Sequence, residues 1–395
     1  MSVSNDVPGM LKPHVRFISE KWPTQYGTTL MRCLQPMEYL SARGWSSEIN
    51  NIYRQVIRES VVFFFHRIRL DEVAKAIVGY IRNIGGILVY DTDDLIFSSD
   101  RSATHAEGLQ GATMHLCNAI TVSTDYLAER ARLLVPDVRV MRNGLSHNYL
   151  READRIFNFK SLEKQRDGKI TIGYCSGSAH HDDDLAFIVP ALAEILESNP
   201  SVKFHLVGKI RIPDLLRRFG ERVILKPFMP YVQFPSVYAD IDINLAPLVL
   251  SNPLALGRSE LKYIEAGACG IPTIASPNGA YRYAISNGVT GFLAEEPRTW
   301  RETLQKLIEH PDLRIQMGVR ARAHTLGEYG PDKRAQEWND LLEDLVSRYG
   351  QQATKGNQPQ RWLNLSWIMF QQRKRAIRLF LRKIIRRNER TSTVV

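Results

Sequence analysis

Gly257-Arg-Ser-Glu-Leu-Lys-Tyr-Ile-Glu-Ala-Gly-Ala-Cys-Gly-Ile-Pro-Thr-Ile-Ala-Ser276 is a stretch that contains, in order, a helix, a run of small residues and a buried strand. Ser259 can cap the helix, because its hydroxyl can accept a hydrogen bond from a backbone N–H of the first turn. The small residues at 266–270 allow close packing before the apolar strand at 272–275. A helix that leads into an apolar strand is typical of an α/β sheet.

Apolar runs of strand length repeat on both sides of this stretch. In the second half of the chain they lie at residues 169–173, 202–207, 223–225, 241–245 and 291–293. In the first half they lie at residues 14–19, 60–65, 86–90, 119–122 and 138–141, with a helix-like segment at 30–43 that ends at Gly44. Near-continuous apolar strands separated by helices predict parallel sheets that are covered on both faces.

The chain is long enough for two domains. Its 395 residues, 44% of them hydrophobic, can build more than one buried core. Turn-forming and charged residues between 143 and 168 separate the two series of strands, so we expect one Rossmann-like domain over residues 1–150 and another over residues 168–350. Two such domains that face each other enclose a cleft at the ends of their strands, where open α/β sheets bind ligands.

The positive charge of the chain is concentrated at its C-terminus. The formal net charge is +10, and residues 371–395 hold nine Lys or Arg against the single acid Glu389. The rest of the chain is nearly neutral and carries no nucleic-acid-binding motif, so we expect no nucleic acid partner. A nucleic-acid-binding protein that uses the basic tail is the alternative from another functional class.

Residues 351–395 form a polar linker and then a basic amphipathic helix, which we expect over residues 361–390. Its apolar residues recur at helical spacing beside a basic face: Leu363, Trp367, Phe370, Ile377, Leu381 and Ile384 against Arg375, Arg378, Arg382 and Arg386. Such a helix can lie on an anionic membrane surface, and the alternative is packing on a partner subunit or on the protein itself. The membrane is favoured, because so many cations gain little in a protein interior.

The cysteines and the N-terminal sequence bear on location. The four cysteines are scattered, without metal-ligand spacing or the density of a disulfide-rich secreted domain, which indicates a reducing compartment. Residues 1–15 lack an apolar core with a cleavage site, and no stretch is apolar for long enough to span a bilayer. We therefore expect a cytoplasmic protein that is peripheral on the inner face of the membrane.

The charged residues of the 257–276 stretch are arranged as in a nucleotide site. The free N–H groups and the positive dipole end of the predicted helix favour an anion, and Arg258 and Lys262 add formal charge near the same turn. Glu265 lies further along, where its carboxylate can accept hydrogen bonds from a ribose. This division of labour between a helix start and a carboxylate is found in nucleotide sites.

A second candidate segment follows the strand at 169–173. Ser176-Gly-Ser178 and the acidic run that follows His181 are, taken alone, an ordinary strand-to-helix turn and a solvated helix start. Beside Glu265 they are favoured as part of the same site.

Residues 257–276, with Asn287-Gly-Val-Thr-Gly-Phe-Leu293, resemble the donor-binding region of retaining GT-B glycosyltransferases related to family GT4, and the similarity covers most of residues 170–345. Residues 173–185 resemble a subgroup of bacterial polysaccharide-related transferases. The resemblance implies that a nucleotide sugar lies on the helix, that Glu265 holds its ribose, and that basic residues stabilise the leaving diphosphate. The implied donor-binding residues are Gly27, Ser176, Gly177, Ser178, His181, Ser259, Leu261 and Glu265.

The same resemblance extends to the first domain. Tyr90-Asp-Thr-Asp-Asp94 ends a strand at the expected cleft, and the related transferases carry a similar element, which makes Asp91, Asp93 and Asp94 candidates for contacts with sugar hydroxyls. Solvated acids at a capped strand end are an equally good interpretation of each one. The implied catalytic residues are Arg258, Lys262, Asp93 and Asp94. His66, which ends another strand, could reach an acceptor, although a lone histidine there more often bonds to the backbone.

Two departures from the family pattern leave alternatives open. Gly257 stands where the usual pair of glutamates would need an acid, and the Gly-Arg…Lys-Gly signature is missing. A catalytically inactive GT-B scaffold is therefore a second alternative. An NAD enzyme is disfavoured, because no Gly-x-Gly-x-x-Gly follows a predicted strand.

The expected activity is a retaining transfer of a sugar from a nucleotide sugar to a hydroxyl of a glycan or lipid-linked acceptor, in surface polysaccharide or glycolipid assembly. No metal and no other cofactor is expected, because GT-B enzymes use the helix dipole and basic side chains to bind the diphosphate.

Overall fold

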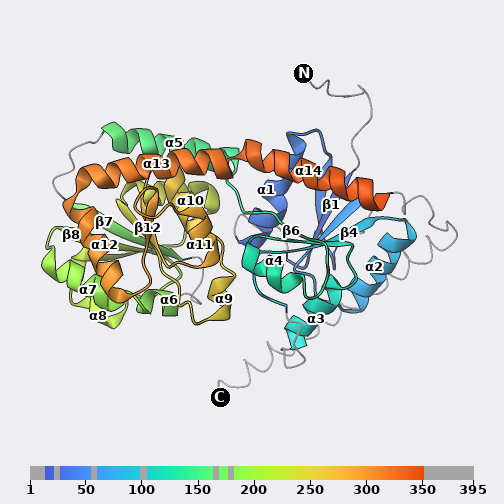
Figure 1. The fold of residues 1–395 in the computed structure, drawn as a ribbon, viewed down its shortest axis with the longest axis horizontal. Coiled ribbons are helices and arrows are strands. Elements are labelled where there is room, and N and C mark those ends of the chain that lie inside the picture. Colours follow the sequence, from blue (N-terminus) through green and yellow to red (C-terminus); the bar gives the residue numbers. More distant parts are fainter. Residues whose placement is uncertain are drawn as a thin grey trace, which may run out of the picture.

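The computed structural model describes residues 14–21, 27–54, 60–97, 105–162, 169–176 and 182–350. In this part of the chain two six-stranded parallel sheets lie side by side, each covered by helices (Figure 1). The expected α/β architecture is confirmed. The basic helix expected at residues 361–390 lies outside the described residues, and no described helix has the length and apolarity needed to cross a bilayer.

The first sheet has the order β2-β1-β3-β4-β5-β6. Its strands are β1 (Val15–Ser19), β2 (Ser47–Asn51), β3 (Val62–His66), β4 (Ile87–Thr92), β5 (Ala119–Val122) and β6 (Val138–Val140). All neighbouring pairs are parallel. Strand β2, Ser-Glu-Ile-Asn-Asn, was not predicted from apolar runs, because it is a polar edge strand that pairs only with β1.

Successive strand residues point to opposite faces of this sheet, and both sets are apolar. A layer of helices therefore covers each face. The apolar residues of α2 (Glu72–Asn83) and α4 (Asp125–Ala131) pack on one face, together with Met114 at the end of α3 (His105–Met114). On the other face lies α1 (Gln35–Ser41), which continues from a short π-helical segment, Leu30–Leu34. The helix expected at 30–43 is therefore present, and Gly44 ends it in a left-handed conformation with φ 77°.

The second sheet has the order β12-β11-β10-β7-β8-β9, which is the arrangement of the classical dinucleotide-binding sheet. Its strands are β7 (Ile170–Ser176), β8 (Val202–Gly208), β9 (Val223–Lys226), β10 (Ile243–Ala246), β11 (Thr273–Ala275) and β12 (Gly291–Leu293). One face is covered by α7 (Val189–Ser198) and α12 (Pro297–Glu309). The other is covered by α5 (His147–Leu162), the 3-10 segment η4 (Tyr231–Ala239), α10 (Leu261–Ala268), α11 (Gly279–Ala284) and α13 (Pro311–Tyr329). Short helices α6 (Asp182–Ala186), α8 (Asp214–Arg217) and α9 (Pro253–Leu256) lie in the connections.

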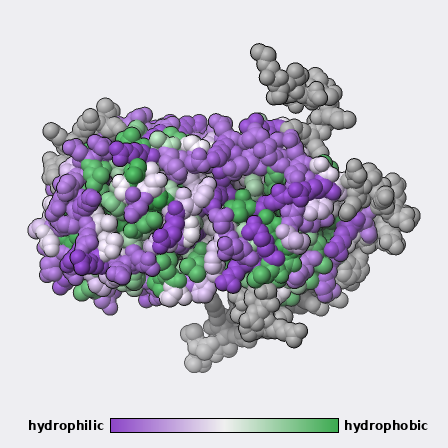
Figure 2. Space-filling view, in the orientation of Figure 1, coloured by the Kyte–Doolittle hydropathy of each residue, from purple (hydrophilic) through white to green (hydrophobic). Residues whose placement is uncertain are grey.

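The last described helix, α14 (Pro331–Tyr349), returns to the first sheet. Expected as part of the second domain, it packs instead beside α1, where the Trp338 ring lies 5.4 Å from Phe64 and 6.1 Å from Phe17 between centroids. Without α14, the rings of Phe17 and Phe64 on this face of the first sheet would be exposed to water. The outward side of α14 is hydrophilic (Figure 2).

The strand orders locate the ligand crevices. The order of each sheet reverses at one point, between β1 and β3 in the first and between β7 and β10 in the second. Open α/β sheets bind ligands beyond the carboxyl ends of the strands at such points. The second reversal lies beside α10, whose first turn is held by a hydrogen bond from Asn244 of β10 to the Lys262 carbonyl, 3.1 Å long.

Candidate functional site

Helix α10 carries the two residues that the sequence places at the centre of the site. It begins at Leu261, with Glu260 at the N-cap position and no side-chain cap. The expected cap by Ser259 is therefore wrong. The Ser259 hydroxyl lies one residue outside the cap position and accepts a hydrogen bond from Asn143 Nδ2 at 3.0 Å.

Glu265 lies near the middle of α10 and is 6% exposed. Burial raises the pKa of Glu265 to about 8, and the positive charge of Lys262 opposes this shift. The carboxyl group therefore carries a proton through most of the neutral range. It can donate one hydrogen bond and accept others, as recognition of ribose hydroxyls requires.

Lys262 lies one turn before Glu265, close to the end of β7. Its ammonium nitrogen is 4.2 Å from the centre of the Tyr174 ring. Burial lowers the pKa of Lys262 to about 8, and the carboxylate of the buried Asp184 opposes this shift. The result is a cation at neutral pH that is only partly solvated, so an incoming phosphate gains more from it than from a fully hydrated lysine.

The second strand-end segment is described only in part. Ser176 ends β7 and is buried, and its carbonyl lies so close to Gly208 of β8 that any side chain at 208 would collide with it. Gly177, Ser178 and His181 lie outside the described residues. The buried Asp184 of the acidic run faces inward, where it accepts a hydrogen bond from the Val249 N–H at 3.0 Å.

Asp93 and Asp94 extend from the end of β4 toward the second domain. Arg67 contacts both, with Nε 3.3 Å from Asp93 Oδ1 and Nη2 2.5 Å from Asp94 Oδ2. Arg258 Nη1 lies 3.6 Å from Asp94 Oδ1. Two residues expected to be catalytic, one from each domain, are thus brought into contact.

Arg67 itself has an unusual backbone. Its φ is 56°, the only positive value among the described residues other than glycine. A bulky side chain in this region costs free energy, and such residues concentrate at functional sites.

Asp91 has a different environment from its two neighbours, and the expectation that it contacts a sugar is wrong. It is fully buried, where Arg32 donates to both carboxylate oxygens at 3.1 and 2.7 Å. His66 Nδ1 and Thr121 Oγ1 lie 3.0 and 2.7 Å from the same carboxylate. Although burial disfavours the charge, Arg32 and His66 hold the pKa of Asp91 well below its usual range.

Arg32 is not among the site residues expected from the sequence. It is 1% exposed, and besides Asp91 its guanidinium donates to the Met141 carbonyl at 2.5 Å and to Asn143 Oδ1 at 3.2 Å. At the other end of this network, His66 Nε2 lies 3.0 Å from Thr28 Oγ1, beside Gly27. Gly27 has φ 74° and accepts a hydrogen bond from the Leu30 N–H. The signal in the sequence is a single arginine among the apolar residues of a helix, which indicates a buried arginine paired with an acid.

Residues 257–260, just before α10, are contacted one after another by the first half of the chain. We call this segment the clasp. Thr124 Oγ1 lies 3.5 Å from the Gly257 carbonyl, Asp94 pairs with Arg258, Asn143 bonds Ser259, and Arg142 lies 3.5 Å from Glu260. A Cβ at position 257 would lie 3.0 Å from Leu127, so this position packs against the first domain.

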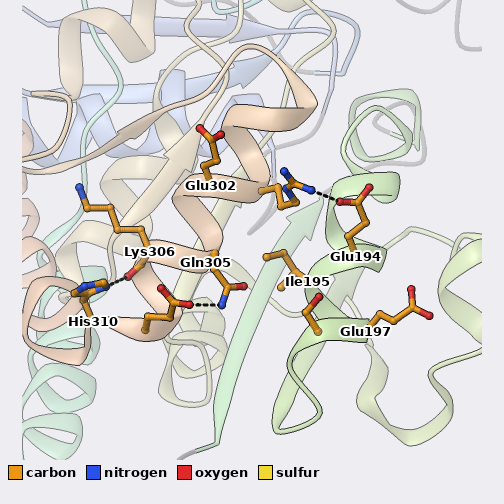
Figure 3. A pocket seen from close by; sticks show the side chains of 10 residues that line it. Glu194, Ile195, Glu197, Glu302, Gln305, Lys306 and His310 are labelled. Carbon is orange, nitrogen blue, oxygen red and sulfur yellow. Dashed lines mark hydrogen bonds and ion pairs between the residues drawn. The ribbon is translucent and has the colours of Figure 1, made fainter.

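Two other features bear on ligands. Within the described ranges, no three His, Cys, Asp or Glu side chains are grouped to hold a metal ion. A surface hollow between α7 and α12 is lined by Glu194, Gln305 and His310 among others, and in it Arg301 donates to Glu194 and Gln305 donates to Glu309 (Figure 3). It opens on the side of the second sheet away from α10, so it is not part of the cleft.

Comparisons with known proteins agree with this architecture. Residues 169–310 match the family model described as "Glycosyl transferases group 1". The D-inositol 3-phosphate glycosyltransferase of Thermobispora bispora is 29% identical over 129 residues, which are 32% of this chain and 27% of the relative. The GDP-mannose-dependent monoacylated alpha-(1-6)-phosphatidylinositol monomannoside mannosyltransferase of Corynebacterium glutamicum is 24% identical over 163 residues, 40% and 42% of the two chains. The chain thus spans less than half the length of these relatives.

Solved structures extend the likeness to most of the chain. HepE of Anabaena, in complex with UDP and glucose, matches with a TM-score of 0.59 at 14% identity, over 84% of this chain and 100% of that one. Sucrose-phosphate synthase of Thermosynechococcus elongatus matches with a TM-score of 0.59 at 15% identity, over 85% and 100%. At these identities the likeness shows the fold, and the expected arrangement of two Rossmann-like domains is confirmed.

Proposed function

We propose that this chain, with its GT-B fold and a second domain similar to the group 1 glycosyltransferases, is a retaining glycosyltransferase related to family GT4. It takes a sugar from a nucleotide sugar and transfers it to an acceptor hydroxyl. The observation that carries the proposal is α10, which presents a buried carboxyl and a partly desolvated lysine beside the strand-order reversal of the second sheet. A GDP-mannose-dependent relative and the complex of HepE with UDP fit a nucleoside diphosphate donor.

The leaving group determines what the second domain must do. As the glycosidic bond breaks, negative charge develops on the diphosphate. Lys262, Arg258 and the N–H groups at the start of α10 lie within one short segment of the chain, and together they would stabilise this charge. Glu265, four residues after the start of the helix, would bind the ribose.

The first domain supplies the opposite wall. Asp93 and Asp94 are held by Arg67 at the cleft edge and can accept hydrogen bonds from sugar hydroxyls. No side chain is assigned as a nucleophile. Retention then follows from attack of the acceptor hydroxyl on the same face from which the diphosphate departs, which is the usual proposal for this family.

The acceptor and the location are proposed from the tail. A basic amphipathic helix at residues 361–390 would hold the protein on an anionic membrane at the cytoplasmic side, and a glycan or lipid-linked acceptor in surface polysaccharide assembly fits such a place. Sedimentation with vesicles containing anionic lipid tests this, by comparing the full chain with a chain ending at residue 350. Equal sedimentation of the two would contradict it.

Calorimetry tests the donor site. The full-length protein is titrated with UDP, GDP and dTDP and with their sugar conjugates, alongside Glu265→Ala, Glu265→Gln and the control Glu302→Ala, an exposed acid on the outer helix α12. We expect selective binding of one nucleotide, weakened at least about tenfold by Glu265→Ala and unchanged in the control. Absence of binding by every nucleotide would contradict the proposal.

A catalytically inactive scaffold is the second candidate. It is favoured by Gly257, where the expected acid is absent and the backbone packs against Leu127. Tight nucleotide binding without hydrolysis or transfer of the sugar, with a panel of acceptors, would support the scaffold.

A further inference from the structure

The starting observation is a continuous line of hydrogen bonds that crosses from the core of the first domain to the clasp. Asp91 fixes the guanidinium of Arg32 through two hydrogen bonds, and Arg32 donates to Asn143 Oδ1. Asn143 Nδ2 then donates to Ser259 Oγ. Asp91, Arg32 and Asn143 are all buried, so each bond is made away from competing water.

The amide of Asn143 determines which group donates and which accepts along this line of hydrogen bonds. Arginine has only donors, so the group that it contacts on Asn143 must be the amide oxygen. The amide nitrogen is thereby turned toward Ser259, where it can only donate. The Ser259 oxygen is occupied as an acceptor, and its own hydrogen remains to be donated elsewhere.

The position of Ser259 shows where that hydrogen can go. The residue is partly exposed, between Arg258 and the start of α10, and within the described residues no acceptor takes its hydroxyl hydrogen. Its neighbours along the chain include the Arg258 guanidinium and the N–H groups of the first turn of α10, and these groups are donors. A hydroxyl turned this way completes a set of donors around one anion.

We propose that Asn143, oriented by the buried Arg32, is a positioning residue of the donor site, which turns the Ser259 hydroxyl so that it donates its hydrogen to an anionic oxygen of the nucleotide sugar. The inference rests on the proposed function, because it names how the first domain prepares the diphosphate end of that same site. Its residues lie outside the set expected from the sequence, apart from Ser259.

Asn143→Asp tests the direction of the line. The aspartate keeps the size of the side chain and its bond from Arg32, but it can only accept, so the Ser259 hydroxyl must turn its hydrogen toward residue 143. We expect the affinity for the nucleoside diphosphate to fall about tenfold or more, together with a rise of the donor KM and a smaller change of kcat.

Asn50→Asp is the matched control. Asn50 is a second buried asparagine of the first domain whose oxygen accepts from a buried arginine, Arg16, at 2.5 Å. It lies on β2, the edge strand opposite to β6, and thus away from the clasp. Thermal unfolding of both variants reports any general loss of stability, and nucleotide affinity should stay unchanged in the control.

Asn143→Asp also adds a negative charge, which could itself repel the nucleotide. A double-variant cycle with Ser259→Ala separates this charge effect from the effect through the hydroxyl. If residue 143 acts through the hydroxyl, the aspartate costs much less affinity in the Ser259→Ala background than in the wild type. An equal cost in both backgrounds, or an Asn143→Asp affinity like that of Asn50→Asp, would overturn the inference while leaving the donor site intact. If the wild type binds no nucleoside diphosphate and no pyrophosphate, both proposals fall.

Discussion

Glu265→Gln should change how stability depends on pH. Burial raises the pKa of Glu265 to about 8 from an ordinary value of 4.5. Between these two values the folded protein keeps the proton and the unfolded chain has lost it, so unfolding releases a proton and rising pH favours unfolding. The stabilisation is fully present below the unfolded pKa and is lost as pH rises toward 8. Glutamine has the same shape and does not titrate.

The size of the effect follows from the release of one proton on unfolding, at pH values between the two pKa values of Glu265. The free energy of unfolding of the wild type, relative to Glu265→Gln, should fall by about 1.4 kcal/mol for each pH unit, or about 3 kcal/mol between pH 5 and pH 7. The sign is the opposite of that expected for a salt-bridged glutamate, whose contribution grows as pH rises. All other titrating groups are common to the two proteins and cancel in the comparison.

The assay must report on the second domain alone. Hydrogen exchange of peptides from α10 and β11, measured against denaturant concentration at several pH values, gives the stability of that region. Infrared spectroscopy supplies an independent readout, since a protonated carboxyl band at neutral pH should disappear in Glu265→Gln. Parallel stability profiles of the two proteins, with no such band, would refute the reasoning.

Three further outcomes are expected. Lys262→Met should weaken nucleoside diphosphate binding about ten- to a hundredfold in calorimetry at neutral pH. This loss should shrink as pH rises through about 8, where the wild-type lysine loses its proton. Trp338→Ala should lower the free energy of unfolding by about 3–5 kcal/mol in denaturant titrations, because it leaves a cavity against Phe17 and Phe64, and a loss below about 1 kcal/mol would contradict the packing. Gly318→Ala should destabilise by about 1–3 kcal/mol, since its Cβ collides with the Gly270 carbonyl, whereas Gly327→Ala on the same helix meets open space and should be neutral or stabilising.

The sequence was informative wherever a segment forms its structure locally. The apolar runs from β3 to β12 match the strands to within a few residues, since buried parallel strands are apolar on both faces. Edge strand β2 was missed because it is polar. It pairs only with β1 among the described strands, and an edge strand with a solvated side need not be apolar. The N-cap of α10 was expected at Ser259, one residue before its position at Glu260, and the Ser259 hydroxyl bonds to Asn143 of the first domain instead.

The site could be predicted as a list of residues on one helix, but its long-range partners could not. Nothing in the spacing shows that Asp91 is buried while Asp93 and Asp94 face the cleft. That difference arises because Arg32, 59 positions earlier in the chain, lies under the strand end. The same limit applies to the clasp, where each contact joins residues more than a hundred positions apart.

The return of α14 to the first sheet has a consequence for synthesis on the ribosome. When residues 15–140 have left the exit tunnel, Phe17 and Phe64 lack the tryptophan that will cover them, and that residue is made some 200 codons later than β6. The nascent second domain has all of its own strands and α13 before Trp338 is translated. The usual N-to-C order of completion is therefore reversed for this chain, and the domain that is made first is the last to close.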